Sequence, residues 1–173
     1  MRRILLYVLY TLLSTSCSTF SGIPEIIIHA EELMPQNPDS ALFLLGSLNT
    51  GNINSQKIRA KYAVVYSQAL DKNYIDETND SLITIAVKYY KKHGNIKEKF
   101  MSLYYLGRIQ YNAGHYTRAM LSYMEAIPLI EQLDDDYLSG LLFSQISQIY
   151  ANNFEYANSL NAAEEAYKYF LRT

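Results

Sequence analysis

The sequence has no tryptophan, a single cysteine, and only seven glycines and four prolines among its 173 residues. The glycines occur singly and form no phosphate-cradling loop. The three histidines show no HExxH spacing, and no serine is framed as a nucleophile elbow. Two pairs of adjacent glutamates, Glu31-Glu32 and Glu164-Glu165, point to different sides of any helix that carries them. These absences predict a chain with no catalytic activity, no metal and no cofactor.

A surplus of positive charge is also missing. Fifteen basic residues stand against 17 acidic ones, for a formal net charge of −2, and the one basic run beyond the first residues is Lys91-Lys92. Nucleic-acid binding is therefore not expected. Lys88, Lys91-Lys92 and His93 are interpreted as cations at a helix end and not as a phosphate site. The acidic run Asp134–Asp136 lacks the spacing of a calcium loop and is interpreted as a helix start.

The residues that are abundant indicate one soluble domain. Hydrophobic residues make up 49% of the chain and charged residues 18%, which is typical of a globular protein with an ordinary core. A tyrosine side chain fills volume between helices while its hydroxyl reaches water, so 17 tyrosines suit a thin two-layer solenoid. The alternative is that the tyrosines form aromatic platforms for a sugar or a peptide.

The beginning of the chain has the features of a targeting segment. Arg2-Arg3 precede the apolar stretch Ile4–Leu13, which is too short to cross a bilayer, and small residues then lead to Cys17. The pattern resembles a bacterial lipoprotein signal, although Ser14 stands where an aliphatic residue is usual. This resemblance implies removal of residues 1–16, acylation of Cys17 and a short tether over residues 17–22. The alternative is a plain cleaved signal. The absence of an acidic run after Cys17 favours a membrane anchor that faces the periplasm.

The clearest unit of the chain is Phe100–Leu133, in which two apolar helical runs flank the turn Asn112–His115. Apolar or small residues recur every three or four positions in each run, so each helix has one stripe to bury. The unit therefore predicts an antiparallel helical hairpin. Pro128 predicts a kink or an early tightening of the second helix. The stripes consist of Leu103, Leu106, Gly107 and either Gln110 or Tyr111 in the first run and of Ala119, Tyr123, Ala126 and Ile130 in the second.

The remaining chain contains three imperfect copies of this unit, which cover Ile23–Asn49, Ser55–Gly94 and Asp136–Arg172. Aligning Leu106 with Ile146 gives a shift of 40, and aligning Val65 with Leu106 gives a shift of 41. Gly94 is predicted to end its helix with a left-handed cap. The connection Lys72–Thr78 is longer than a usual repeat turn, which indicates an insertion on one rim or a copy that has drifted.

The clearest unit resembles a tetratricopeptide repeat, which carries Leu-Gly, a Gly-x-Tyr turn, and then alanines around an aromatic residue. Two departures are Gln110, where a tyrosine is usual, and the early Pro128, with no proline at the end of the unit. The period also exceeds the usual ~34 residues. The resemblance implies an all-α fold, a right-handed α-α superhelix of four antiparallel hairpins over residues 23–173. The matching positions are Leu103, Leu106-Gly107, Gly114, Tyr116, Ala119, Tyr123 and Ala126.

The resemblance also implies a groove, because first helices line the concave face in that family. Such a groove would clasp an extended peptide through its backbone amides, with Arg108 reaching a carboxylate. Met101 and Tyr105 replace basic residues of the clamp found in the chaperone-tail-binding members, so that ligand is not expected. The alternative is that these side chains only hydrate the groove. The implied positions are Met101, Tyr104, Arg108, Tyr111 and Asn112 on one copy and Leu141, Ser144, Gln148, Ala151 and Asn152 on the last.

These expectations describe a membrane-anchored scaffold of the bacterial cell envelope that binds a protein or peptide partner. It resembles the sensor part of longer signalling lipoproteins. The alternative is a glycan-binding lipoprotein of a nutrient-capture system, with Tyr104 and Tyr111 as stacking platforms. Leu160, Tyr167 and Phe170 predict an apolar edge on the eighth helix, which would dock a partner, a second copy of the chain or further repeats.

Overall fold

The computed structural model describes residues 22–173, and all regular secondary structure in this range is helical. The predicted signal, residues 1–16, and the predicted lipidation site Cys17 lie outside the described residues, as does the tether apart from Gly22. The elements in chain order are α2 (Ile23–Leu33), α3 (Pro38–Gly46), η1 (Thr50–Asn52), α4 (Gln56–Lys72), α5 (Ser81–His93), α6 (Ile96–Asn112), α7 (Tyr116–Ala126), η2 (Ile127–Leu129), α8 (Ile130–Leu133), α9 (Asp136–Asn152) and α10 (Tyr156–Phe170).

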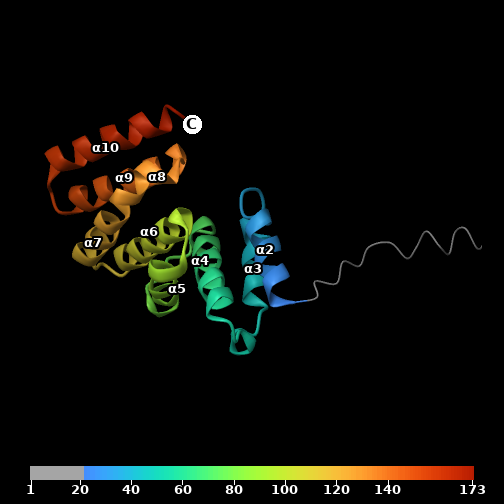
Figure 1. Ribbon diagram of the computed structural model, residues 1–173. Coiled ribbons are helices and arrows are strands. Elements are labelled where there is room, and N and C mark those ends of the chain that lie inside the picture. Colours follow the sequence, from blue (N-terminus) through green and yellow to red (C-terminus); the bar gives the residue numbers. More distant parts are fainter. Residues whose placement is uncertain (1–21) are drawn as a thin grey trace, which may run out of the picture.

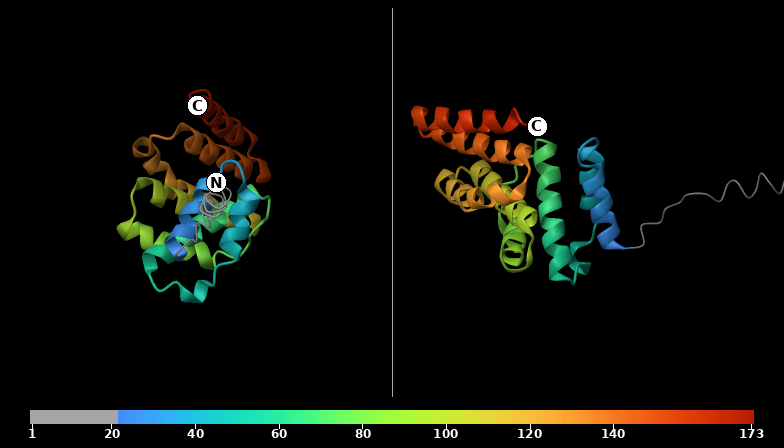
Figure 2. Two further views of the ribbon diagram at one scale, coloured as in Figure 1. Left: turned by 90° about the vertical axis from the view of Figure 1, so that its right-hand side faces the viewer. Right: turned by 45° about the horizontal axis from the view of Figure 1, so that its top comes forward.

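The helices pack in consecutive pairs, which confirms the predicted all-α solenoid of helical hairpins. The pairs are α2 with α3, α4 with α5, α6 with α7, and α9 with α10. They form a curved row, in which α9 and α10 run crosswise to α2 and α3 (Figure 1 and Figure 2). The right hand of the superhelix stays a prediction of the family resemblance. Within residues 22–173, no helix is both long enough and apolar enough to cross a membrane.

The first helices of the last three pairs repeat with a constant period. Helices α4, α6 and α9 have 17 residues each and begin at Gln56, Ile96 and Asp136, which are evenly spaced in the sequence. A polar side chain caps each of them: Ser55, Asn95 and Asp135 accept a hydrogen bond from the backbone N–H three residues further on. Such caps satisfy one of the unpaired donors at a helix start. The same local signal thus starts each repeat at the same place.

The first helices also end in the same way. Tyr74, Gly114 and Phe154 occupy equivalent positions in the three repeats and all have positive φ, at 58°, 75° and 61°. The backbone N–H of the following residue donates in each case to the carbonyl five residues earlier, as in a Schellman turn. In this register Tyr66, and not Val65, is the equivalent of Leu106, so the alignment of Val65 with Leu106 is wrong by one residue. Because Val65 and Tyr66 are adjacent and both large and apolar, the sequence pattern did not show which of them matches Leu106.

The second helices keep the period in their buried small residues. Ala86, Ala126 and Ala166 are buried on α5, α7 and α10. Pro128 interrupts the second helix of the central pair, which changes to the 3₁₀ turn η2 before α8, and so confirms the predicted tightening. Helix α5 begins seven residues after Tyr74, whereas α7 and α10 begin two residues after Gly114 and Phe154, which confirms an insertion.

The core has two parts that meet at α4. Ala60, Ala63 and Val64 on one side of α4 pack into the large core shared with α5 to α10. Tyr62 and Val65 on the other side pack into the smaller core of α2 and α3. Burial raises the pKa of Tyr62 to about 12. Helix α4 is therefore the element that joins the first hairpin to the others.

The predicted left-handed cap at Gly94 is wrong. Gly94 has φ −82° and ψ 150°, which is extended backbone, and its N–H donates to the carbonyl of Tyr90. The next residue, Asn95, already caps α6, and Glu98 completes a reciprocal capping box with it. Because the chain must enter α6 immediately, an extended residue and not a left-handed one joins the two helices.

Candidate functional site

Helices α6 and α9 carry the groove positions implied by the sequence, and we call the surface that these two helices form with α4 the first-helix face. The constant period places two rows of polar side chains on it. The first row consists of Gln68, Arg108 and Gln148, and the second row consists of Lys72, Asn112 and Asn152. Each row takes one residue from each of the three helices, so a ligand that lies across the helices would meet both rows.

Arg108 joins all three helices of this face. Its Nε and Nη2 atoms donate to Oδ1 of Asp71 on α4, at 2.9 and 2.6 Å, and its Nη1 atom donates to Oε1 of Gln145 on α9 at 2.8 Å. Burial lowers the pKa of Arg108, but the charge of Asp71 and the hydrogen bond to it outweigh that effect, so the pKa is raised and the guanidinium stays charged. The predicted ligand contact of Arg108 is thus already occupied by the protein itself.

Met101 and Tyr104 belong to the core and not to an open groove. Their side chains are 8% and 4% exposed and pack in the large core. The ring of Tyr104 stacks on Phe100 and meets the ring of Tyr105 edge to face. Burial raises the pKa of Tyr104. A sugar cannot reach a ring that is covered in this way. The prediction that Tyr104 is a stacking platform is therefore wrong.

Tyr111 and Asn112 lie near the end of α6 and contact neighbouring repeats. Nδ2 of Asn152 donates to the hydroxyl of Tyr111 at 2.7 Å, which connects α9 to α6. Nδ2 of Asn112 donates to the carbonyl of Glu77 at 3.4 Å, which ties the inserted connection before α5 to the first-helix face. These contacts hold the ends of the rows in place.

Ser144 and Gln148 are the predicted positions with the least involvement in packing. Ser144 is half-buried and Gln148 is exposed. Neither side chain makes a hydrogen bond within residues 22–173, and the same holds for Gln68, the repeat equivalent of Gln148 on α4. The neutral amides on both sides of Arg108 therefore remain available to a ligand.

Sequence reasoning missed Asp71, Gln145 and Glu77, which complete the contacts of the first-helix face. The repeat period could have pointed to two of them. Asp71 occupies in its repeat the position that Tyr111 has in the central repeat, and Gln145 occupies the position of Tyr105. The shifted register of the α4 copy hid the first relationship. Glu77 has no such signal, because it lies in the insertion that has no counterpart in the other repeats.

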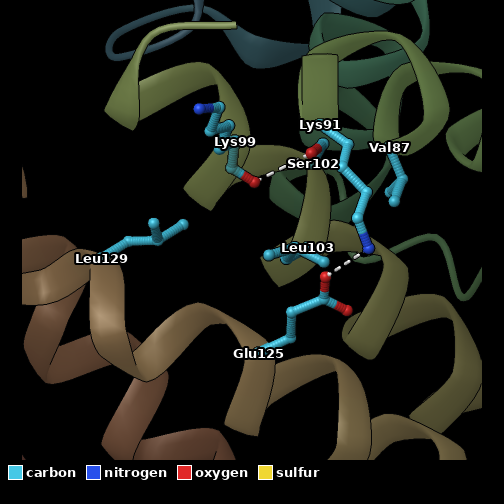
Figure 3. A pocket seen from close by; sticks show the side chains of 7 residues that line it. All are labelled: Val87, Lys91, Lys99, Ser102, Leu103, Glu125 and Leu129. Atoms are coloured by element: carbon cyan, nitrogen blue, oxygen red, sulfur yellow. Dashed lines mark hydrogen bonds and ion pairs between the residues drawn. The ribbon is translucent and has the colours of Figure 1, made fainter.

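A cavity of about 120 Å³ lies on another side of the central pair, between α5, α6 and α7. Figure 3 shows the ammonium of Lys91 meeting the carboxylate of Glu125 across this space, at 3.2 Å. Leu103 and Leu129 supply apolar walls. Pockets for small organic ligands usually measure about 300–1,000 Å³. This cavity is too small for such a ligand, and the carboxylate of Glu125 is already paired with Lys91, while Lys99 is a third charged residue of the lining.

A larger depression, of about 360 Å³, lies between the start of α4 and the end of α5. Arg59, Lys88, Lys92 and His93 line it, and no acidic residue is among its lining residues in the described part of the chain. The ring of His93 lies 4.9 Å from that of Tyr89. The basic residues, interpreted from the sequence as helix-end cations, thus face the solvent together with Arg59.

The sequence matches no protein-family model, and no curated protein sequence matches it. The likeness to tetratricopeptide repeats therefore rests on the residues of the clearest unit and on the helical pairs. The pairs agree with that family in architecture, and their period is longer than the usual ~34 residues.

Proposed function

We propose that the first-helix face binds an extended peptide segment of a partner protein, and that the chain is a scaffold with no reaction of its own. The observation that carries this proposal is the first polar row. Gln68 and Gln148 keep their amides unpaired within residues 22–173, while Arg108 between them holds α4, α6 and α9 together. A ligand would thus meet a surface that is already in position and would not have to order it.

The chemistry of the rows suits a peptide backbone. A glutamine or asparagine amide offers two donors and one acceptor group, which match the carbonyl and N–H of an extended chain. Packed helices lie about 8–10 Å apart, and an extended chain advances about 3.3 Å per residue. Roughly three peptide residues therefore pass each helix, and a segment of about six to nine residues meets all three.

The charge on this face limits which segment binds well. Asp71 neutralises Arg108, so the centre of the first row offers no free charge. Lys72 is exposed at one end of the second row. We expect a segment with uncharged residues at its centre and an acidic residue or a carboxyl terminus near α4.

Site-specific photo-crosslinking tests this proposal. A photoreactive amino acid placed at Gln148 should capture a partner protein in intact cells, and the same amino acid at the exposed Leu121 on α7 should not. The crosslinked partner is then identified by mass spectrometry, and the crosslinked segment is mapped. Adding the Gln68→Ala and Asn152→Ala substitutions should lower the yield. A partner captured equally from both positions, or one that these substitutions do not affect, would contradict binding at the first-helix face.

We propose further that the chain is attached to a membrane by a lipid on Cys17 and faces the periplasm. The proposal rests on the order of basic, apolar and small residues before Cys17. Cells that express the chain are fed an alkyne fatty acid, and the labelled protein is detected after coupling to a fluorophore. The label should be present in the wild type and absent from Cys17→Ala. A labelled Cys17→Ala variant would contradict attachment at this residue.

A further inference from the structure

One side of α10 is an apolar surface that the described structure leaves open. Helix α10 lies at the outer edge of the row of helices and packs against α9 (Figure 1 and Figure 2). Leu160 and Tyr167 on its other side are 60% and 64% exposed. Exposed apolar side chains that recur every three or four residues gather on one face of a helix. The apolar stripe consists of Tyr156, Leu160, Ala163 and Tyr167 on α10 and of Leu171 directly after it, and the exposed Glu164 borders the stripe near its centre.

The repeat register shows that this stripe corresponds to an interface within the chain. Counted back by one repeat, Tyr156, Leu160, Ala163 and Tyr167 fall on Tyr116, Met120, Tyr123 and Ile127. Tyr123 is buried, and the other three are partly buried against the large core, where α7 also meets α9. Part of this burial comes from α6 of the same pair, because Tyr123 packs on Gly107, whereas the equivalent side chains on α10 are exposed.

The stripe is also nearly symmetric about its centre. Leu160 lies three residues before the small residue Ala163, and Tyr167 lies four residues after it. Tyr156 lies seven residues before it and Leu171 eight after it. A second copy of α10 in the antiparallel direction would therefore place Leu160 against Tyr167 and Tyr156 against Leu171. A small residue at the crossing point lets two helices approach closely.

Charge at the two ends of α10 favours the same arrangement. Glu155 is acidic and lies before the helix, whereas Lys168 and Arg172 are basic and lie at its other end. Arg172 pairs with Asp136 of its own chain at an exposed position and remains accessible to another carboxylate. An antiparallel neighbour would bring Glu155 of each copy close to the basic end of the other.

We propose that the chain forms a two-fold symmetric homodimer, in which the apolar stripes of α10 pack against each other antiparallel with Ala163 at the crossing. The interface is isologous, so each copy uses the same residues and the assembly closes at two subunits. It leaves the first-helix faces of both copies open, and it does not depend on the proposed peptide binding.

Sedimentation equilibrium of the full chain in density-matched detergent tests the dimer. The wild type should show a monomer–dimer equilibrium. The double variant Leu160→Glu/Tyr167→Glu should weaken self-association by about tenfold or more, because it places charge at the centre of the interface. The control Leu121→Glu/Met124→Glu adds the same charge at two exposed apolar residues of α7 and should leave the equilibrium unchanged. Far-UV circular dichroism checks that every variant stays helical.

Cysteine crosslinking tests the position of the axis. In a Cys17→Ser background, Ala163→Cys should form a disulfide-linked dimer under mild oxidation, because a disulfide needs Cα atoms about 4.4–6.8 Å apart. Asn161→Cys, an exposed position two residues before Ala163 that points away from it, should not crosslink. A wild type that stays monomeric at its highest soluble concentration would overturn the proposal and leave the stripe to a different partner. A dimer that both double variants weaken equally, or that Ala163→Cys does not crosslink, would also overturn it.

Discussion

The ring of Tyr123 on α7 lies so close to Gly107 on α6 that a Cβ atom at position 107 would overlap it. Tyr123 is completely buried, and its neighbours include the ring of Tyr104, at 6.2 Å between centroids. The missing side chain of Gly107 therefore creates the space for a full aromatic ring from the second helix. This contact sets how closely the two helices of the central pair approach each other.

Gly107→Ala should destabilise the protein, even though alanine is the better helix former. The added methyl group would push the buried Tyr123 ring out of its position, and overpacking of this kind costs about 1–3 kcal/mol. Urea denaturation followed by circular dichroism measures the change. Gly46→Ala is the matched control, because a Cβ there meets nothing within 4 Å. If Gly107→Ala were as stable as Gly46→Ala, the close approach of the two helices would be contradicted.

Tyr123→Phe should make the protein more stable. The hydroxyl of Tyr123 is buried without a hydrogen-bond partner in the described structure, and burial raises its pKa well above the usual value. An unpaired buried polar group costs about 1–3 kcal/mol, and phenylalanine removes it without changing the ring. A rise in the urea midpoint is expected. Tyr62→Phe, which loses a hydrogen bond to the carbonyl of Leu45, should lower the midpoint instead. A lower midpoint for Tyr123→Phe would show that its hydroxyl has a partner.

The ion pair between Arg108 and Asp71 should contribute measurably to stability, since both side chains are more than three-quarters buried. A double-mutant cycle with Arg108→Ala and Asp71→Ala should give a coupling energy of about 1 kcal/mol. The exposed pair of Lys91 and Glu125 is the comparison and should give a smaller value. Equal coupling energies for the two pairs would mean that Arg108 does not hold the first helices together.

Phe154→Gly should stabilise the turn between α9 and α10. Phe154 has φ 61° and an exposed ring, so it bears the cost of the left-handed conformation and gains little from packing. The expected gain is about 1 kcal/mol, seen as a higher thermal midpoint. Gly114→Ala reverses the change at the repeat-equivalent position, where a Cβ would meet nothing within 4 Å, and should cost a similar amount. Two variants that shift stability in the same direction would contradict this interpretation.

Much of the fold could be predicted because its signals are local. Ser55 and the acidic run ending at Asp136 mark first-helix starts, and Pro128 tightens a second helix, through contacts that reach only a few residues along the chain. The cap Asn95 is equally local but was not recognised, so the start of α6 was placed four residues too late. Gly94 was misjudged for the same reason, since its conformation depends on how quickly the next helix begins. The predicted groove was less reliable, because the position of a residue on a helix face does not show what a neighbouring helix covers.

By itself, the sequence determined the order of the helical pairs, the tightening at Pro128 and a nearly constant repeat period, whereas the predicted unit began at Phe100 and α6 begins at Ile96. Propensity, capping and apolar spacing act within one or two helical turns, so they can be read along the chain. Only the tertiary structure decided that Tyr104 is buried, that Arg108 is bound by Asp71 and Gln145, and that Gln148 remains open. Those outcomes depend on residues that lie far apart in the sequence and meet only when the repeats stack.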